Sequence, residues 1–363
     1  MKKVDKYGIF AICYSLCIGF FPCFGTSLII SYSKCASIPA SIIGLVVGLL
    51  PLSIILYIFN SDGNKNVFEY NVDNLKFLGK ILNILFFISV MYLGFTISWA
   101  LIKFTITHLL FRNNPYIITI FLFSIVALCV IKGKEVISRS SLLLLYILII
   151  LLVFTFSTLT PSFNISNIFP MVNVSRSDFL TSVFAISAFG VTPYIGLLSF
   201  RKNDITDNKK INKTIVLSYI AGIITYILFL VFIIGIYGVY LANIFSYPEY
   251  YVFKKINVLN FIQRTENILS IIIYVGLFGS LNTLIYFDKT LLKITFNIKN
   301  KNIINLITYI LAISVPLISV FLFKNYKPYF LIRDFPLFSY IILGFIFINF
   351  IIILIRKKVF KKI

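Results

Sequence analysis

Long runs of apolar residues, separated by short polar loops, make up most of this chain. A helix of about 20 apolar residues crosses about 30 Å of hydrocarbon at 1.5 Å per residue. The pattern therefore predicts an all-α integral membrane protein with about ten transmembrane helices, of which the third is long, the fourth is short and the sixth is the most polar. The ten runs lie near residues 7–32, 38–59, 78–108, 115–131, 141–160, 179–200, 214–237, 267–290, 303–323 and 335–355.

Composition excludes the soluble classes. The chain has 363 residues, of which 60% are hydrophobic and 12% are charged, whereas a soluble domain carries about 25% charged residues. Its 39 Phe and 22 Tyr are also too many for a coiled-coil or disordered protein. The sequence contains no Walker A motif, no nucleophile elbow and no paired catalytic carboxylates. We therefore expect neither an enzyme nor a cofactor.

The net charge of +21 is explained by topology. Sorting the Lys and Arg residues by loop places 23 on the side of the N-terminus and 9 on the opposite side, with Lys103 inside the third run. Because loops rich in Lys and Arg stay in the cytoplasm, this excess predicts that both termini are cytoplasmic. Anionic lipid headgroups are then the expected partners of the basic loops, and nucleic acid is not needed.

No polar segment is long enough to form a second domain, so residues 1–363 are expected to form a single membrane domain. A five-plus-five arrangement divides it into repeat one at about 7–160 and repeat two at about 179–323, with the helix near 335–355 either completing repeat two or standing outside it. Five scattered Cys without a CxxC motif and a single His predict neither structural disulfides nor a metal site.

The first and sixth runs, which begin the two halves, are both interrupted. Pro22 and Pro193 lack the amide hydrogen that a helix interior needs, and neighbouring glycines lower helix propensity. Broken helices in corresponding positions are typical of inverted-repeat transporters, which bind their ligands at such breaks. Ordinary kinks are the alternative, since Pro51 and Pro316 lie in other runs. The predicted ligand-binding residues at the breaks are Gly19, Pro22, Gly25, Thr26, Ser27, Ser187, Gly190 and Thr192.

Polar residues in the third and eighth runs could complete such a site. Ser98 and Trp99 are predicted to face the central cavity, although a lone Trp can also serve packing alone. Asn282 and Thr283 are the corresponding candidates in the eighth run, and Ser280 with Thr283 forms a possible ion site. The alternative for this group is close helix packing, because Gly276 and Gly279 precede it.

Two charged residues also lie in these runs. Lys103 can either extend toward the interface or face a polar cavity, because an unpaired ammonium inside the membrane is costly. Asp288 is expected at the cytoplasmic end, paired with Lys289 or Lys293, and a proton-relay role is the alternative.

Residues 247–266 resemble the B-subunit family of spore germinant receptors (GerAB/GerKB type). The resemblance rests on an aromatic-Pro-x-Glu start and on a Phe-Ile-x-Arg-x-Glu segment that opens a helix. Its structural motif residues are Pro248, Glu249, Phe261, Arg264 and Glu266. Gly25-Thr26 also resembles the family's GTG segment, although Ser27 replaces the second glycine and Tyr274 or a neighbour stands where Trp is common. Arg264 and Glu266 form either a salt bridge at a helix start or a solvated pair.

The resemblance implies a relative of the amino acid–polyamine–organocation transporters with a LeuT-like fold, located in the inner spore membrane. It further implies a subunit that recognises a small germinant, often an amino acid, and works with an A-subunit and a C-subunit. Backbone amides at the breaks would hold the ligand carboxylate, and the third and eighth runs would shape its pocket. An ion-coupled amino acid transporter is the first alternative, and a scaffold without a ligand is the second.

Overall fold

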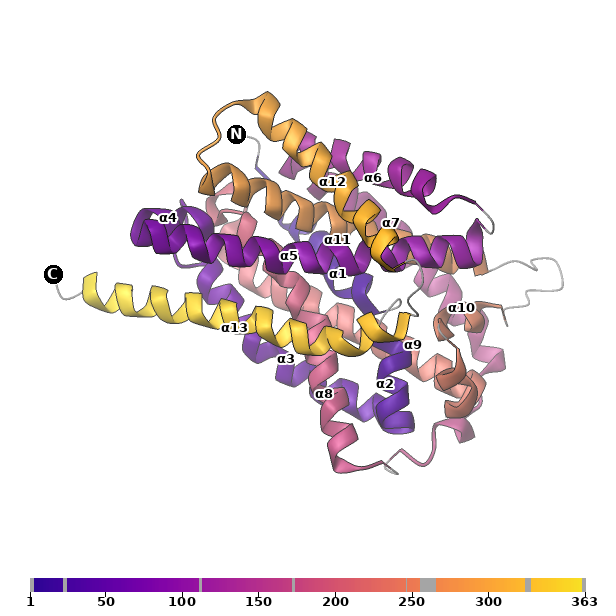
Figure 1. The fold of residues 1–363 in the computed structure, drawn as a ribbon. Coiled ribbons are helices and arrows are strands. Elements are labelled where there is room, and N and C mark those ends of the chain that lie inside the picture. Colours follow the sequence, from indigo (N-terminus) through magenta and orange to yellow (C-terminus); the bar gives the residue numbers. More distant parts are fainter. Residues whose placement is uncertain are drawn as a thin grey trace.

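A computed structural model describes residues 3–21, 25–110, 113–171, 174–245, 247–254, 266–323 and 328–360. Over these ranges the secondary structure is helical, apart from one isolated β-bridge between Val4 and Ile205 (Figure 1). The α-helices are α1 (Lys6–Phe20), α2 (Thr26–Ser33), α3 (Ser37–Phe59), α4 (Val67–Leu75), α5 (Phe77–Phe104), α6 (Pro115–Lys132), α7 (Lys134–Leu159), α8 (Arg176–Val191), α9 (Ile211–Ile244), α10 (Pro248–Phe253), α11 (Glu266–Thr295), α12 (Lys301–Phe323) and α13 (Pro328–Phe360).

The predicted transmembrane runs correspond to these helices. Nine helical stretches within the described residues are long and apolar enough to cross a membrane. The predicted run 7–32 accounts for the difference, because it is divided between α1 and α2. α1 has only 15 residues, or about 22 Å at 1.5 Å per residue, which is too short to span alone. α2 continues into α3 through the short 3-10 helix η2 (Lys34–Ala36).

Local sequence signals mark several helix ends. The Asn66 side chain accepts a hydrogen bond from the Glu69 amide, and the Glu69 carboxylate accepts one from the Asn66 amide, which forms a capping box at α4. α6 begins with Asn114 as its N-cap and Pro115 as its first residue, where a missing N–H costs nothing. Gly133, at φ 99°, allows the tight turn between α6 and α7.

Helices from both predicted halves interleave. α1, α3, α8 and α9 pack against one another, and α5, α6, α11 and α12 form a second group in which α5 packs on α11 and α6 on α12. Contacts of α1 with α11 join the two groups. Since each group draws helices from both halves, neither half can bury its apolar surface alone. The exact boundaries of the two repeats stay a prediction.

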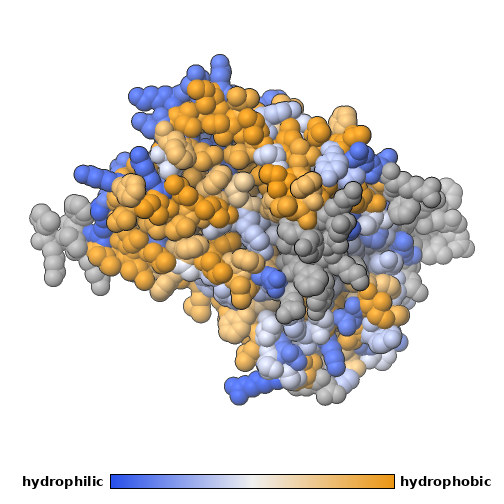
Figure 2. All heavy atoms as spheres, in the orientation of Figure 1, coloured by the Kyte–Doolittle hydropathy of each residue, from blue (hydrophilic) through white to orange (hydrophobic). Residues whose placement is uncertain are grey.

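The outer surface of the helices is apolar, as a membrane protein requires. Large hydrophobic side chains such as Leu50, Phe121 and Phe321 are 69%, 72% and 72% exposed. Figure 2 shows an apolar band over the middle of the molecule, with hydrophilic residues on both sides of it. The chain is therefore an all-α integral membrane protein that crosses the membrane several times.

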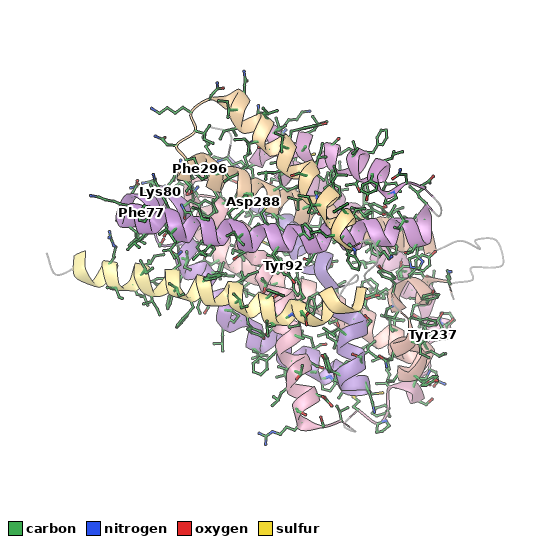
Figure 3. All side chains as sticks on the ribbon, viewed as in Figure 1. Phe77, Lys80, Tyr92, Tyr237, Asp288 and Phe296 are labelled. Atoms are coloured by element: carbon green, nitrogen blue, oxygen red, sulfur yellow. The ribbon has the colours of Figure 1, made fainter. Side chains whose placement is uncertain are left out.

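The loops assigned to the N-terminal side meet one another in the structure. Lys6 pairs with Asp207 at 2.7 Å, Lys134 pairs with Asp204 at 2.5 Å, and the Lys289 ammonium donates to the Val130 carbonyl at 2.9 Å. Figure 3 shows Phe77, Lys80 and Phe296 at one end of the molecule and Tyr237 at the other. This arrangement agrees with the alternation of loops that the sequence predicts, while the cytoplasmic location of the termini stays a prediction.

Candidate functional site

The first break separates α1 from α2. α1 ends at Phe20 and α2 begins at Thr26, with Gly25 as its N-cap. Within the described part of the chain, no side chain caps the first amides of α2, and Gly25 itself has right-handed helical dihedral angles, φ −83° and ψ −41°. Thr26 is buried, and its hydroxyl donates to the Phe21 carbonyl at 3.4 Å, whereas Ser27 is half-buried. Pro22, which was also predicted to bind ligand, lies outside the described residues.

The second break changes the helix type. α8 ends at Val191, and the chain continues as the 3-10 helix η6 (Thr192–Ser199), with Pro193 in its first turn. η6 forms the C-terminal part of this helical stretch, because Phe200 after it is extended. Thr192 is fully buried, and its hydroxyl has no hydrogen-bond partner among the residues that the structure describes. The sixth predicted run is therefore interrupted where the sequence analysis expects it.

The two breaks meet around Phe21. The Phe21 ring stacks on Tyr226 of α9 with centroids 3.9 Å apart, and it lies 6.1 Å from the ring of Phe189 in α8. Glycine permits this close approach on the α8 side, because a methyl group at Gly190 would come within 2.8 Å of the Ile223 Cδ1 atom and 3.7 Å of the Phe21 ring. A methyl group at Gly25 would lie 3.1 Å from the same Phe21 ring.

Ser187 faces a different neighbour. Its hydroxyl donates to the Phe184 carbonyl at 2.8 Å and lies 3.0 Å from the Tyr340 hydroxyl of α13. Phe189 in the same helix also stacks on α13, with its ring centroid 4.7 Å from that of Phe335. Ser187 therefore connects α8 to α13, whereas Gly190 and Thr192 lie at the break itself.

The small residues of α11 hold this helix close to α1. A methyl group at Gly19 would lie 2.6 Å from the Ser280 hydroxyl oxygen and 2.9 Å from the Gly276 carbonyl oxygen. The Ser280 hydroxyl donates to the Ser15 carbonyl at 2.8 Å across this contact. These contacts fit the packing alternative for Gly19 and Ser280, and the ion-site role of Ser280 stays a prediction.

Thr283 and Asn282 follow Ser280 along α11. The Thr283 hydroxyl donates to the Gly279 carbonyl at 2.9 Å, and a methyl group at Gly196 of η6 would lie 2.9 Å from the Thr283 methyl carbon. Asn282 is fully buried, and across the described ranges neither its amide nitrogen nor its oxygen has a partner. The structure thus brings Thr283 to η6 and leaves the Asn282 amide available to a ligand.

Ser98 shares a cavity with Asp288. A cavity of about 10 Å³ lies between α5, α11 and α12, and its lining includes Gly94, Ser98, Asp288 and Pro316. Trp99, the next residue in α5, is 3% exposed. Lys103 is half-buried toward the far end of the same helix. Ser98 and Trp99 are not among the residues that line the break at Phe21, so their role in ligand binding stays a prediction.

The expected ion pair of Asp288 is wrong. Lys289 instead donates to the Val130 and Ile131 carbonyls at 2.9 and 3.3 Å. Asp288 is 4% exposed, and its Oδ1 atom has no partner in the part of the chain that the structure describes (Figure 3). The reason is helical geometry, since adjacent residues in a helix point about 100° apart. Lys289 reaches α6, while Asp288 points between α5 and α12.

The motif at 247–266 is only partly described. Pro248 opens α10, Glu266 opens α11, and Phe261 and Arg264 lie outside the described residues, so the predicted Arg264–Glu266 pair does too. Glu249 is the residue whose importance the sequence analysis missed. It is 1% exposed, and neither carboxyl oxygen has a hydrogen-bond partner among the described residues. A Glu set among Tyr and Pro in Tyr-Pro-Glu-Tyr-Tyr was the available signal.

Glu249 reaches the first break. A second cavity of about 10 Å³, enough for one water molecule, is lined by Ile18, Phe21, Thr225, Tyr226, Phe229 and Glu249. Burial raises the pKa of the Glu249 carboxyl to about 8, and the nearby Thr26 hydroxyl opposes this shift only in part. Among the described residues, no group of three or more His, Cys, Asp or Glu side chains could hold a metal ion.

The sequence profile described as spore germination protein matches residues 3–327. The chain belongs to this family. The match covers both broken helices, α10 and α11, so it includes every element of the site at Phe21. No curated protein matches the sequence.

Solved structures similar to this member of the spore germination protein family are transporters with a LeuT-like fold. A Na⁺-coupled sialic acid symporter, in its substrate-bound outward-open state, has a TM-score of 0.63 at 9% identity, covering 93% of this chain and 78% of the symporter. Mhp1, a nucleobase-cation-symport-1 family transporter, has a TM-score of 0.61 at 13% identity, covering 91% and 74%. A mutant of the Eremococcus coleocola manganese transporter has a TM-score of 0.59 at 12% identity, covering 95% and 78%. At these identities the similarity shows the fold.

Proposed function

We propose that this protein is the permease-like subunit of a spore germinant receptor and that it binds a small nutrient, an amino acid, between its two broken helices. The observation that carries the proposal is the meeting of both breaks at Phe21, with unpaired polar atoms around it. The Tyr226 hydroxyl and the Glu249 carboxyl line the cavity at Phe21, and both are buried without hydrogen-bond partners in the described ranges. The Thr192 hydroxyl, at the start of η6, is also buried and unpaired among the described residues. Unpaired buried polar groups destabilise a protein, so their presence at one place indicates a ligand that pairs with them.

The start of α2 is the position proposed for the ligand carboxylate. α2 begins at Thr26, and no described side chain caps it, whereas the Thr192 amide at the start of η6 already donates to the Ala188 carbonyl. The positive end of the α2 helix dipole favours an anionic group at such a position. An amino acid carboxylate at the start of α2 would lie beside the rings that surround Phe21.

Thermal stabilisation of the purified protein tests this proposal. Amino acids, sugars and nucleosides are screened, and we expect amino acids to raise the unfolding midpoint. Gly190→Leu would fill the space beside Ile223 and is expected to remove this stabilisation, while Gly344→Leu, at a position where an added methyl group meets no described atom within 4 Å, should keep it. A scaffold without a ligand predicts no stabilisation of the parent protein by any compound.

The receptor role has its own test. We infer that the subunit signals to an A-subunit and a C-subunit in the inner spore membrane, with its termini in the cytoplasm. Deletion of the gene in a spore-former is expected to abolish germination with at least one small nutrient. Unchanged germination with every small nutrient would contradict the receptor role, even if the purified protein binds amino acids.

An ion-coupled secondary amino acid transporter is the second candidate, and Asp288 favours it. An acidic side chain buried within a transmembrane helix, with Oδ1 unpaired among the described residues, is typical of proton or ion pathways. Uptake into proteoliposomes that depends on a proton or sodium gradient would support transport. Binding of an amino acid without any flux would favour the receptor.

A further inference from the structure

Glu249 and Asp288 are the two buried acidic residues with unpaired oxygens in the described part of the chain, and of these Glu249 lies at the cavity beside Phe21. Asp204, Asp207, Glu69 and Asp73 each pair with a Lys or Arg at the opposite end of the molecule. Glu249, in contrast, is buried in α10 without a hydrogen-bond partner for either oxygen among the described residues. A buried carboxylate without a counterion is strongly unfavourable, so this position is suited to receiving a positive charge.

The walls of its cavity indicate which kind of positive charge. Phe21, Tyr226 and Phe229 contribute three aromatic rings, and Ile18 contributes an apolar side chain. Aromatic faces attract organic cations, and such rings around an ammonium group form a recurrent recognition site. Hard metal ions such as Ca²⁺ take six to eight oxygen ligands. Here the free oxygens of the described lining are the two of Glu249 and the hydroxyl of Tyr226.

The backbone favours a cation as well. α1 ends at Phe20, and its last turn lies at this cavity through Ile18. The carboxyl end of a helix carries partial negative charge, which attracts cations and repels anions. The start of α2, on the other side of the break, has the opposite polarity.

We propose that Glu249, together with Phe21, Tyr226 and Phe229, binds the ammonium group of the ligand. The ligand class is then a small primary amine, which includes the amino acids of the proposed function. This inference rests on the proposed function, since it assigns the cationic half of the same site. α10 thereby becomes part of the binding site, where the family motif had suggested only a structural role.

The test compares matched ligands on purified full-length protein. The probes are alanine and leucine, their analogues without the amino group, propionate and 4-methylpentanoate, and their analogues without the carboxylate, ethylamine and 3-methylbutylamine. The proposal predicts that removing the amino group lowers affinity on the order of tenfold or more, as expected for a charge-assisted contact. Equal affinity for an amino acid and its analogue without the amino group would overturn it.

Glu249→Gln removes the charge and keeps the shape. We expect this variant to lose on the order of tenfold in affinity for the amine-bearing probes and nothing for propionate. Asp178→Asn is the matched control, because it makes the same carboxyl-to-amide change in the first turn of α8, outside both breaks. Unchanged amino acid affinity in Glu249→Gln would overturn the inference while leaving the proposed function intact.

A second variant and a second measurement keep the test informative if Glu249→Gln does not fold. Phe21→Leu removes one ring and should weaken amine binding severalfold. Calorimetry of alanine binding near pH 7 in two buffers of different ionisation heat should show release of up to one proton, because Glu249, with a pKa of about 8, loses its proton when an ammonium binds. Tyr226 is the other titratable side chain in the described lining of this cavity. Absence of proton release would overturn the inference.

The outcomes separate the two proposals. Binding of a sugar or nucleoside alone would overturn the ammonium site and retain a small-nutrient receptor. No binding by the parent protein to any amino acid, amine, sugar or nucleoside would overturn both.

Discussion

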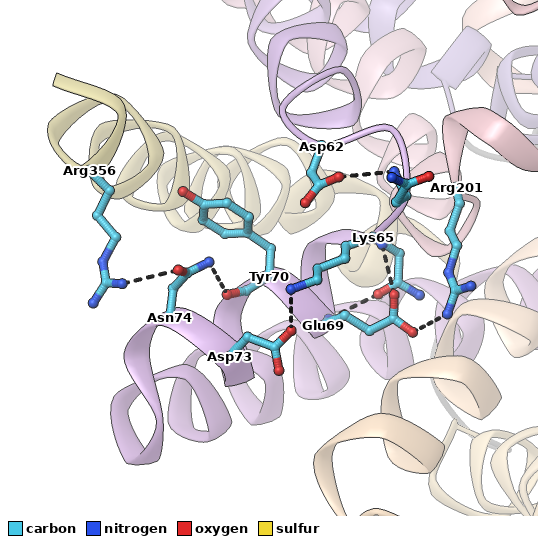
Figure 4. A network of polar contacts seen from close by, with 10 residues as sticks. Asp62, Lys65, Glu69, Tyr70, Asp73, Asn74, Arg201 and Arg356 are labelled. Carbon is cyan, nitrogen blue, oxygen red and sulfur yellow. Dashed lines mark hydrogen bonds and ion pairs between the residues drawn. The ribbon is translucent and has the colours of Figure 1, made fainter. Parts of the chain in front are cut away.

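The two ends of this molecule differ in whether their charged side chains have partners. At the end that holds the N-terminus, Arg201 pairs with Glu69, Lys65 pairs with Asp73 at 2.8 Å, and Arg356 donates to Asn74 at 3.2 Å (Figure 4). Near the opposite end, α10 buries Glu249 with no hydrogen-bond partner among the described residues. Paired charges hold helices together, whereas an unpaired buried charge lowers stability.

This difference indicates that the two regions have different roles, one in holding the fold together and the other in the proposed binding of a ligand. The network in Figure 4 joins α4 to α13 and to the segment that follows η6, and the Val4 amide and carbonyl bond to Asp204 and Thr206 at 2.9 Å each. These contacts connect the segments of the N-terminal end to one another. In the proposed function, the break at Phe21, with its unpaired polar atoms, is the part of the molecule that the ligand stabilises.

The largest expected effect concerns the pH dependence of stability. Burial raises the pKa of Glu249 from 4.5 to about 8, so the folded state keeps a proton that the unfolded state has lost. Stability of the ligand-free protein should therefore fall by several kcal/mol as pH rises from about 4.5 to about 8. Glu249→Gln should remove this slope and raise the unfolding midpoint at pH 8. Parallel curves for the two proteins would show that Glu249 is paired in solution.

The next largest effect is the loss of stability when a methyl group is added at a closely packed glycine. A methyl group at Gly79 of α5 would lie 1.9 Å from the Asn71 carbonyl oxygen, so Gly79→Ala should destabilise the protein by about 1–3 kcal/mol in denaturant unfolding. Gly25→Ala is the matched change at the break, where the nearest atom is a Phe21 ring carbon at 3.1 Å. A side chain can move more easily than a backbone carbonyl, so we expect a smaller cost there. The reverse order would mean that the break is the more rigid region.

Arg201→Ala tests the paired end directly. The Arg201 and Glu69 side chains are 36% and 21% exposed, so solvent weakens their interaction, and the expected loss is about 1–2 kcal/mol. The loss should shrink in high salt. Amino acid binding should persist in this variant, since Arg201 lies beyond the end of η6, whereas the break is at Thr192, where η6 begins. Loss of binding would instead couple the N-terminal end to the site.

The smallest effect is expected at the surface. Lys6→Ala removes the ion pair with Asp207, whose side chain is 45% exposed. Exposed pairs of this kind contribute little, so the unfolding midpoint should stay unchanged within error. A clear destabilisation would show that the N-terminal contact with residues 204–207 is held mainly by this pair and less by the backbone bonds of Val4.

Sequence reasoning was strong where periodicity and charge carried the information. The membrane class, the apolar runs and the loops that share a side all follow from hydropathy and from the Lys and Arg pattern. The breaks were also predictable, because Pro193 and the glycines around it change the backbone locally. The membership in the spore germination protein family confirms the resemblance seen at residues 247–266.

Side-chain partners were harder to predict. Asp288 was expected beside Lys289, yet these neighbours point to different helices. Ser187 was grouped with Gly190, yet its hydroxyl meets Tyr340 of α13, which is 153 residues away in the chain. Glu249 was taken as a motif residue because its place among Tyr and Pro marks it as unusual but does not show that α10 turns it inward. In each case the deciding contact comes from a distant part of the chain.

The sequence by itself determined what depends on local chemistry: which segments enter the membrane, where the helices break, and which loops carry positive charge. Only the tertiary structure decided which polar groups end up without partners, since that depends on how distant helices pack. Phe21 at the end of α1, Tyr226 in α9 and Glu249 in α10 meet at one cavity because of the packing of these helices. We propose the ligand site at that junction because a buried carboxyl group without a partner is stabilised by a ligand that pairs with it.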